Sequence, residues 1–261
     1  MSYIIAITGK GGVGKTTIAG LLISRIAANG LSPVLAVDAD PNSCLDTVLG
    51  AAVKNTVGRI REDVRNQAST GKVTGIAKQQ LLEMKIEESL VEADKFDLIA
   101  MGRPEGPGCY CFANNVLKDV ISKLSSGYPY MVIDNEAGLE NLSRRIVKKV
   151  NLLAMVTVPT KNGLDTVRRL HQLALEMKIE FDKLCIFVNR VRSETHAAHI
   201  EELGKDTNAD FIVELPENQD IISFSEKGKD LLSLPPGNEL IVCIDNFLKK
   251  LFKEKLNGQR S

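Results

Sequence analysis

The chain has 261 residues, with 33 lysines and arginines balanced by 33 acidic residues, and hydrophobic residues make up 44% of it. This balance excludes a protein that binds nucleic acid through bulk positive charge, and the apolar content supports the core of a single large domain over residues 1–261. No apolar run is long enough to cross a bilayer, so we expect a cytoplasmic protein without a stable membrane anchor.

The first two predicted elements enclose a glycine-rich loop. Residues 3–8 form an apolar run typical of a buried strand, and residues 16–29 have the periodicity of a helix that Gly30 ends. The stretch from Gly9 to Thr16 fits the phosphate-loop pattern G-x-x-x-x-G-K-[ST]. Glycines let backbone N–H groups turn toward phosphate oxygens, and the helix N-terminus adds positive charge at the same place. We therefore predict a site for ATP or ADP with Mg²⁺.

Within this loop, Lys15 is predicted to reach the β- and γ-phosphates, and the Thr16 hydroxyl to bind Mg²⁺. A second lysine, Lys10, is not required by the phosphate-loop pattern, so by itself it fits a solvated surface side chain equally well. The predicted nucleotide-binding residues of the loop are Gly9, Lys10, Gly11, Gly12, Val13, Gly14, Lys15, Thr16 and Thr17.

A second predicted strand, residues 34–37, ends in Asp38-Ala39-Asp40-Pro41. Carboxylates at the carboxyl end of a parallel strand face the ligand crevice of an open α/β sheet. Alone, the pattern fits a polar turn with proline as the breaker equally well, and the phosphate loop favours a functional role. The segment 42–94 is mostly polar and helical, with helices predicted at 56–67 and 76–93, and it could contact a partner protein.

The third and fourth predicted strands, residues 96–101 and 130–133, enclose a loop and a helix near 113–123. The fourth strand ends at Asp134, and an apolar strand that closes on an acid resembles a Walker B strand. Beyond it, strands are predicted at 152–158, 185–188 and 211–215, and helices at 163–177 and 239–255. This alternation predicts an α/β fold with one doubly wound, mostly parallel sheet flanked by helices.

Two further features could bind ligands. Asn189 follows the 185–188 strand, where its carboxamide would either read an adenine edge or cap the strand end. Cys109 and Cys111 lie one residue apart, and two thiolates at this spacing can bind one metal ion together. The pair supplies half of a tetrahedral site, which a two-fold dimer would complete for Ni²⁺ or Zn²⁺. The other cysteines are poorer candidates to complete it: Cys44, Cys185 and Cys243.

The stretch from Lys10 to Thr16 resembles the deviant Walker A signature. That family includes the Min and Par ATPases, the arsenite-pump ATPases, the nitrogenase iron protein and the nickel-insertion ATPases. The resemblance implies that Lys10 reaches across a homodimer interface to the partner's nucleotide, and that Asp40 orients the attacking water. It also places Asp38 near Mg²⁺, Asp134 on a Mg²⁺-bound water, Asn189 on adenine and Pro216 beside the base.

The cysteine pair makes the resemblance more specific. Gly-Pro-Gly-Cys-Tyr-Cys, with Asp-Asn-Glu-Ala-Gly from Asp134, resembles the nickel-insertion ATPases of carbon monoxide dehydrogenase. It implies an ATP-hydrolysing homodimer, with Lys10, Lys15 and Asp40 in catalysis, that loads nickel into the apo-enzyme. Glu136 replaces the family's proline, and no cysteine follows Asp134 as in the nitrogenase iron protein. The alternatives are an ATPase serving acetyl-CoA synthase, a positioning or partition ATPase, and a nucleotide-gated iron–sulfur carrier.

Overall fold

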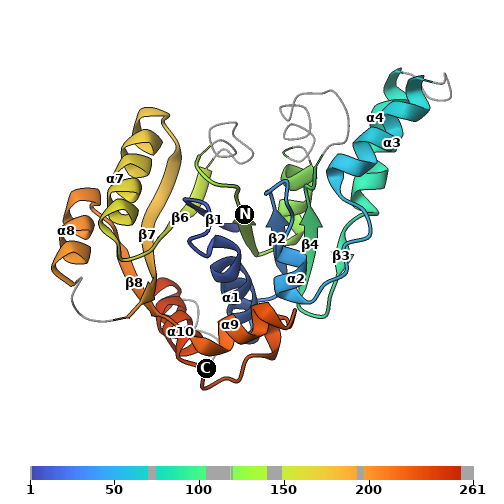
Figure 1. Cartoon of the computed structure of the whole chain (residues 1–261). Helices are drawn as coiled ribbons and strands as arrows, with labels where there is room; N and C mark the ends of the chain where they lie inside the picture. The colour runs from blue at the N-terminus through green and yellow to red at the C-terminus, as the bar shows by residue number, and fades with distance from the viewer. Residues whose placement is uncertain are drawn as a thin grey trace.

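The computed structural model describes residues 2–69, 75–103, 118, 120–139, 149–192 and 197–253. Within them, eight strands form one sheet in the order β3-β4-β2-β5-β1-β6-β7-β8 (Figure 1). The strands are β1 (Tyr3–Gly9), β2 (Val34–Asp38), β3 (Val91–Glu92), β4 (Phe96–Ala100), β5 (Tyr130–Asp134), β6 (Lys149–Thr157), β7 (Glu180–Val191) and β8 (Phe211–Pro216). Neighbours pair in parallel, except that β3 runs antiparallel to β4. The predicted mostly parallel sheet is confirmed.

Helices cover both faces of this sheet, as a doubly wound fold requires. They are α1 (Lys15–Ala28), α2 (Leu45–Leu49), α3 (Val57–Ser69), α4 (Gly75–Glu87), α7 (Lys161–Glu176), α8 (Ala197–Thr207), α9 (Gln219–Glu226) and α10 (Glu239–Leu251), with 3-10 turns at Ser125–Gly127 and Leu231–Ser233. The apolar side chains of α1, α2 and α10 share one core with one face of the sheet. On the other face, α3 and α4 cover the β4–β2–β5 side and α7 and α8 the β6–β7–β8 side (Figure 1).

Strand β1 is mostly apolar because both of its faces are buried. Ile5 and Ile7 pack into the core shared with α1 and α10, and Ala6 packs into the core beneath α7. Successive strand side chains point to opposite faces, so a strand between two helix layers becomes a continuous apolar run. This burial fixes β1 at the centre of the sheet, and with it the loop that follows.

Helices α3 and α4 form a hairpin that extends away from the sheet (Figure 1). Its base is anchored by buried Ile60, Val64, Leu82 and Ile86. The helix predicted to run to residue 93 ends at Glu87 instead. Leu90 and Val91 continue a helical spacing of apolar residues, but Val91 pairs with Leu98 of β4, so strand pairing ends the helix there.

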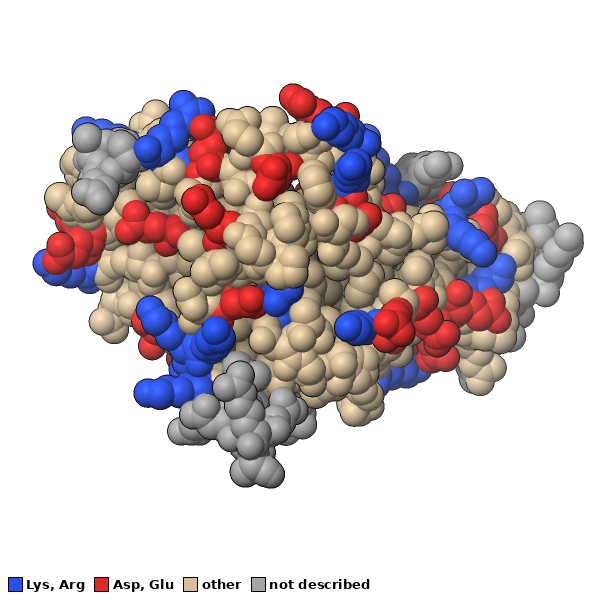
Figure 2. All heavy atoms as spheres, turned by 90° about the horizontal axis from the view of Figure 1, so that it is seen from below, with Lys and Arg blue, Asp and Glu red and all other residues tan. Residues whose placement is uncertain are grey.

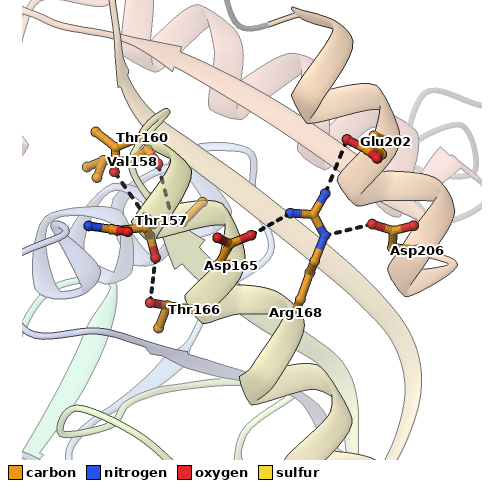
Figure 3. Close-up of polar contacts among 10 residues, drawn as sticks. Thr157, Val158, Thr160, Asp165, Thr166, Arg168, Glu202 and Asp206 are labelled. Carbon is orange, nitrogen blue, oxygen red and sulfur yellow. Dashed lines mark hydrogen bonds and ion pairs between the residues drawn. The ribbon is translucent and has the colours of Figure 1, made fainter.

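Helices α7 and α8 are joined by one arginine (Figure 3). Arg168 Nε donates to Asp206 Oδ2 at 2.6 Å and Nη1 to Asp165 Oδ1 at 2.9 Å, and Nη2 lies 3.6 Å from a Glu202 oxygen. A guanidinium offers several donors in a rigid plane, so it can serve three carboxylates at once. This network fixes α8 against α7, the helix that follows β6.

The charged surface matches the balanced composition. Figure 2 shows acidic and basic side chains interspersed over the face seen from below, and neither sign covers it alone. Among the described residues, no helix is both long enough and apolar enough to span a membrane.

Candidate nucleotide-binding site

The phosphate loop begins where β1 meets its neighbour β6. A Cβ on Gly9 would lie 2.3 Å from the carbonyl oxygen of Val156, so only glycine allows this close approach. Gly12 and Gly14 have φ values of 78° and 99°, in the left-handed region that favours glycine. Gly14 is also the N-cap of α1. The backbone N–H groups of the loop therefore lie next to those of the first turn of α1, where binding of an anion is favourable.

Lys15 and Thr16 place a cation and a hydroxyl at the start of α1. The Lys15 side chain is buried, and its Nζ lies 3.3 Å from the Lys10 carbonyl oxygen, which accepts its hydrogen bond. The Thr16 side chain is hydrogen-bonded to Asp134. Lys10, by contrast, is exposed. The structure thus separates the two lysines, with one inside the site and one on its surface.

Two buried carboxylates stand side by side next to this loop. Asp38 ends β2, Asp134 ends β5, and the two residues are register partners. Asp38 accepts hydrogen bonds from the backbone N–H groups of Leu45 at 3.0 Å and Asp40 at 3.1 Å. Burial raises the pKa of Asp38 to about 7, helped by the nearby charge of Asp134. Burial also raises the pKa of Asp134 to about 6, against the opposing hydrogen bond from Thr16 and the charge of Lys15.

These side chains fit a bound Mg²⁺. One oxygen of Asp134, Oδ1, is buried and has no hydrogen-bond partner among the described residues. Such an atom is costly unless a ligand satisfies it. Thr16, Asp38 and Asp134 offer only oxygen donors, which Mg²⁺ prefers, and it is commonly held by one or two carboxylates plus phosphate oxygens. In the described part of the chain, no three His, Cys, Asp or Glu side chains gather as a metal cage.

The loop after β2 brings Asp40 to the same site. Its Oδ1 accepts hydrogen bonds from the backbone N–H and the side-chain amide of Asn42, at 2.8 and 3.0 Å. Arg103 Nη2 donates to the Asn42 side-chain oxygen at 2.6 Å, which ties this loop to the end of β4. Asp40 is partly exposed, so its carboxylate is accessible from the site.

The segment after Asp134 is tied to the end of β1. The side-chain amide of Asn135 donates to the Ile7 carbonyl oxygen at 2.9 Å, and the Gly138 N–H donates to the Gly9 carbonyl oxygen at 3.2 Å. The Thr8 hydroxyl donates to the Gly138 carbonyl oxygen. These bonds hold the segment against the phosphate loop although Glu136 replaces the family's proline.

The phosphate loop, the loop after β2 and the segment after β5 surround a cavity of about 570 Å³. A cavity of this size lies within the range that holds small ligands and cofactors. It is lined by Gly11, Gly12, Gly14, Lys15, Thr16, Thr17, Asp40, Asn42, Glu136, Ala137 and Arg190.

Asn189 lies on the far side of the loop, at the end of β7. Its side-chain nitrogen donates to the Val13 carbonyl oxygen at 2.9 Å, and its side-chain oxygen accepts from the Arg190 N–H at 3.0 Å. A Cβ on Gly14 would lie 2.4 Å from that nitrogen. Asn189 therefore holds the phosphate loop in place through its hydrogen bond to the Val13 carbonyl oxygen. Pro216, at the end of β8, pairs with Val191 of β7.

A family model described as the CobQ/CobB/MinD/ParA nucleotide binding domain matches residues 4–232. The chain belongs to this family. It is therefore a nucleotide-binding protein of the MinD/ParA class, which confirms the coarse prediction made from the loop signature.

Curated relatives cover most of the chain. An uncharacterized ATP-binding protein of Methanocaldococcus jannaschii is 40% identical over 97% of this chain and 99% of its own length. The carbon monoxide dehydrogenase accessory protein CooC of Rhodospirillum rubrum is 27% identical over 89% of this chain and 90% of its own. The septum site-determining protein MinD of Thermotoga maritima is also 27% identical, over 87% of this chain and 79% of its own.

A solved structure agrees with the fold. The septum site-determining protein MinD of Pyrococcus horikoshii, in complex with Mg-ADP, superposes with a TM-score of 0.71 over 100% of this chain and 99% of its own. The two sequences are 20% identical, so this likeness concerns the fold alone.

Cys109 and Cys111 lie outside the described residues. Of the other cysteines, Cys44 is exposed, Cys185 buried and Cys243 partly buried. Arg190 lines the cavity but was not predicted. A cation directly after a strand-end asparagine was its only signal in the sequence.

Proposed function

We propose that this chain is a Mg²⁺-dependent ATPase that acts as a homodimer and inserts nickel into the apo-enzyme of carbon monoxide dehydrogenase. The observation that carries the hydrolytic part is the environment of Asp134. This acid is buried beside the phosphate loop, is hydrogen-bonded to Thr16, and keeps one oxygen without a partner among the described residues. That arrangement suits a cation next to a phosphate chain.

Each residue of the site has a distinct part in this proposal. The loop N–H groups and Lys15 hold the β- and γ-phosphates, and Asp38 and Asp134 hold Mg²⁺ directly or through water. The bound ion would supply positive charge against the phosphate oxygens. Asp40, accessible and oriented by Asn42, accepts a hydrogen bond from the attacking water. Asn189 and Pro216 lie beside the adenine, as the family resemblance implies.

The exposed side chain of Lys10 supports the dimeric part of the proposal. An exposed lysine on the phosphate loop can extend from its own subunit and reach a nucleotide held by a partner. A cation supplied in this way would stabilise charge on the phosphoryl group as it is transferred. Nucleotide binding would then favour the dimer, because only the paired state lets Lys10 contact the partner's nucleotide.

The nickel part rests on the Cys109–Cys111 pair and on the similarity to CooC over most of both chains. One pair per subunit cannot fill a tetrahedral thiolate shell, but two pairs on a dimer axis can. The cargo ion would be Ni²⁺ or Zn²⁺, since both accept soft thiolate ligands. Opening of the dimer after hydrolysis would separate the pairs and release the ion to the client enzyme.

A metal titration tests this part of the proposal. We expect one Ni²⁺ or Zn²⁺ per dimer, measured by metal analysis with the mass in solution, and weaker binding at low pH because thiols must lose protons to bind. Cys109→Ser and Cys111→Ser should each abolish this binding while ADP binding remains. Cys44→Ser, which removes an exposed thiol elsewhere, is the matched control. One ion per monomer that survives both substitutions would contradict the nickel proposal.

A positioning or partition ATPase is the second candidate, favoured by the similarity to MinD at the same 27% identity as CooC. It predicts the same nucleotide site but no metal shared by the dimer. Activation of purified apo-carbon monoxide dehydrogenase by Ni²⁺, ATP and this protein separates the two candidates. The same assay on acetyl-CoA synthase tests that client, and an absorption spectrum of the purified protein tests an iron–sulfur carrier.

A further inference from the structure

The loop after β2 is attached to the end of β4, the neighbouring parallel strand. The Gly102 N–H donates a hydrogen bond to the Ser43 hydroxyl oxygen at 3.1 Å. Gly102 has a φ of 61°, and a Cβ there would lie 2.3 Å from Thr56 Oγ1. The positive φ and this close approach both favour glycine. The backbone that leads into Arg103 is therefore held in place beside the loop.

The side-chain amide of Asn42 connects Arg103 to Asp40. Its oxygen accepts a hydrogen bond from Arg103 Nη2 at 2.6 Å, and its nitrogen donates to Asp40 Oδ1 at 3.0 Å. If the amide were turned over, its oxygen would face a carboxylate and its NH₂ group would face a guanidinium, and neither pair can form a hydrogen bond. Arg103 therefore determines which way the amide faces, and so provides Asp40 with a donor.

The two carboxylate oxygens of Asp40 have different environments. Oδ1 accepts from both the backbone N–H and the side-chain amide of Asn42, at 2.8 and 3.0 Å. Oδ2 has no hydrogen bond with any side chain or backbone group in the described part of the chain. Asp40 also lines the nucleotide cavity. Holding Oδ1 fixes the orientation of the carboxylate and leaves Oδ2 to accept a hydrogen bond from the attacking water.

We propose that Arg103 is a positioning residue for ATP hydrolysis, which acts on the Asp40 carboxylate through the Asn42 amide. The proposal rests on the hydrolysis in the proposed function, and it adds the end of β4 to the hydrolytic site. Arg103 is not among the residues that line the cavity, so its loss should disturb the orientation of Asp40 and leave ATP affinity unchanged. Arg103 and Asn42 are both exposed, so water competes for their hydrogen bond and the effect should be moderate.

Steady-state hydrolysis by the full chain, together with calorimetric titration of Mg-ADP, tests this proposal. Arg103→Ala should lower kcat about fivefold while KM and ADP affinity stay unchanged, because only the orientation of the carboxylate is lost. Arg103→Lys keeps a donor and should recover most of the rate. Arg169→Ala, which removes an exposed arginine of α7, is the matched control. Unchanged kcat in Arg103→Ala, or an equal loss of kcat and ADP affinity, would overturn the proposal.

Combined substitutions show whether Arg103 acts through the other two residues. The double variant Asn42→Ala/Arg103→Ala should have the same kcat as Asn42→Ala, and adding Arg103→Ala to Asp40→Ala should cause no further loss. Residues that act along one route give such non-additive effects, whereas independent residues give additive ones. A further loss of rate in either background would show that Arg103 acts by another route and would contradict the proposal.

A measurement that needs no hydrolysis separates this proposal from the proposed function. In isotopically labelled protein, the side-chain amide signal of Asn42 is identified by its absence from the Asn42→Ala spectrum. In Arg103→Ala this signal should shift and its protons should exchange faster, while the unfolding temperature stays that of the wild type. An Asn42 signal that is identical in Arg103→Ala and wild type would overturn the proposal. Absence of ATP hydrolysis in the wild type would instead refute the proposed function.

Discussion

The two ends of the nucleotide site differ in whether their polar side chains find hydrogen-bond partners within the described residues. At the β2–β5 end, Asp38 and Asp134 are buried with raised pKa values, and one Asp134 oxygen has no partner in the described part of the chain. At the β7 end, the amide of Asn189 is bonded through both its nitrogen and its oxygen to the backbone. At the first end, a buried carboxylate oxygen has no partner among the described residues, whereas at the second end the side-chain amide is hydrogen-bonded to the backbone. We infer that chemistry depends on the first end and affinity on the second.

The largest expected effect belongs to the acidic end. Asp40→Ala should lower kcat for ATP hydrolysis by about a hundredfold or more, because the attacking water loses its acceptor, while ATP affinity changes little. Steady-state phosphate release and calorimetric ATP binding measure the two quantities. The control is Asp94→Ala. Asp94 is exposed and lies just before β4, so it lies at the opposite end of the parallel strands from Asp40. Normal turnover in Asp40→Ala would break the comparison.

A second effect follows from the raised pKa values of Asp38 and Asp134, about 7 and 6 against an ordinary 3.8. The folded protein holds these protons more tightly than the unfolded chain does. This stabilisation is therefore full below about pH 4 and is lost as the pH rises through 6 and 7. The free energy of unfolding without nucleotide should fall by roughly 2 kcal/mol between about pH 5.5 and 7.5.

Urea unfolding at these two pH values tests this expectation. Asp38→Asn should flatten most of the pH dependence, because an amide has no proton to lose, whereas Asp94→Asn should leave it unchanged. Equal pH dependence in wild type and Asp38→Asn would mean that the acidic end is not the source.

The smallest effect belongs to the β7 end. Asn189→Ala removes the brace on the Val13 carbonyl, and a lost neutral hydrogen bond costs about 1 kcal/mol, so nucleotide affinity should fall roughly fivefold. The value of kcat should remain near that of the wild type. Calorimetry with Mg-ADP, with the exposed Asn55→Ala as control, measures it. A large loss of kcat with intact affinity would reverse the roles of the two ends.

The acidic end was predictable from sequence because each of its residues ends an apolar run. Asp38 and Asp134 follow buried strands, and the phosphate loop follows another, so parallel pairing alone brings them together. The β7 end was only partly predictable. The predicted strand 185–188 is shorter than β7, which begins at Glu180 in a mostly polar stretch. Between Val188 and Val191, β7 advances three residues while β8 advances two, and this irregularity depends on pairing between distant strands, which a local pattern does not record.

The helical segment shows the same limit. The hairpin of α3 and α4 was predicted from periodicity, but α2 and β3 were not. The short helix α2 is positioned by tertiary packing, since a Cβ on Gly20 of α1 would lie 2.3 Å from Val48. The strand β3 exists only as a partner of β4. Elements defined by distant neighbours have no signature of their own in the sequence.

The central position of β1 also determines when the site can form during synthesis. Tyr3 pairs with Tyr130, and Ile5 pairs with Leu152, so the strand made early has both of its neighbours far along the chain. Such long-range pairing slows folding, because chain entropy is lost before the contacts that offset it form. While the ribosome extends the chain to β5 and β6, the apolar β1 lacks its partners, and exposed apolar strands are prone to aggregate. The phosphate loop is thus translated among the first residues, yet it gains its rigid support only after more than half of the protein has been made.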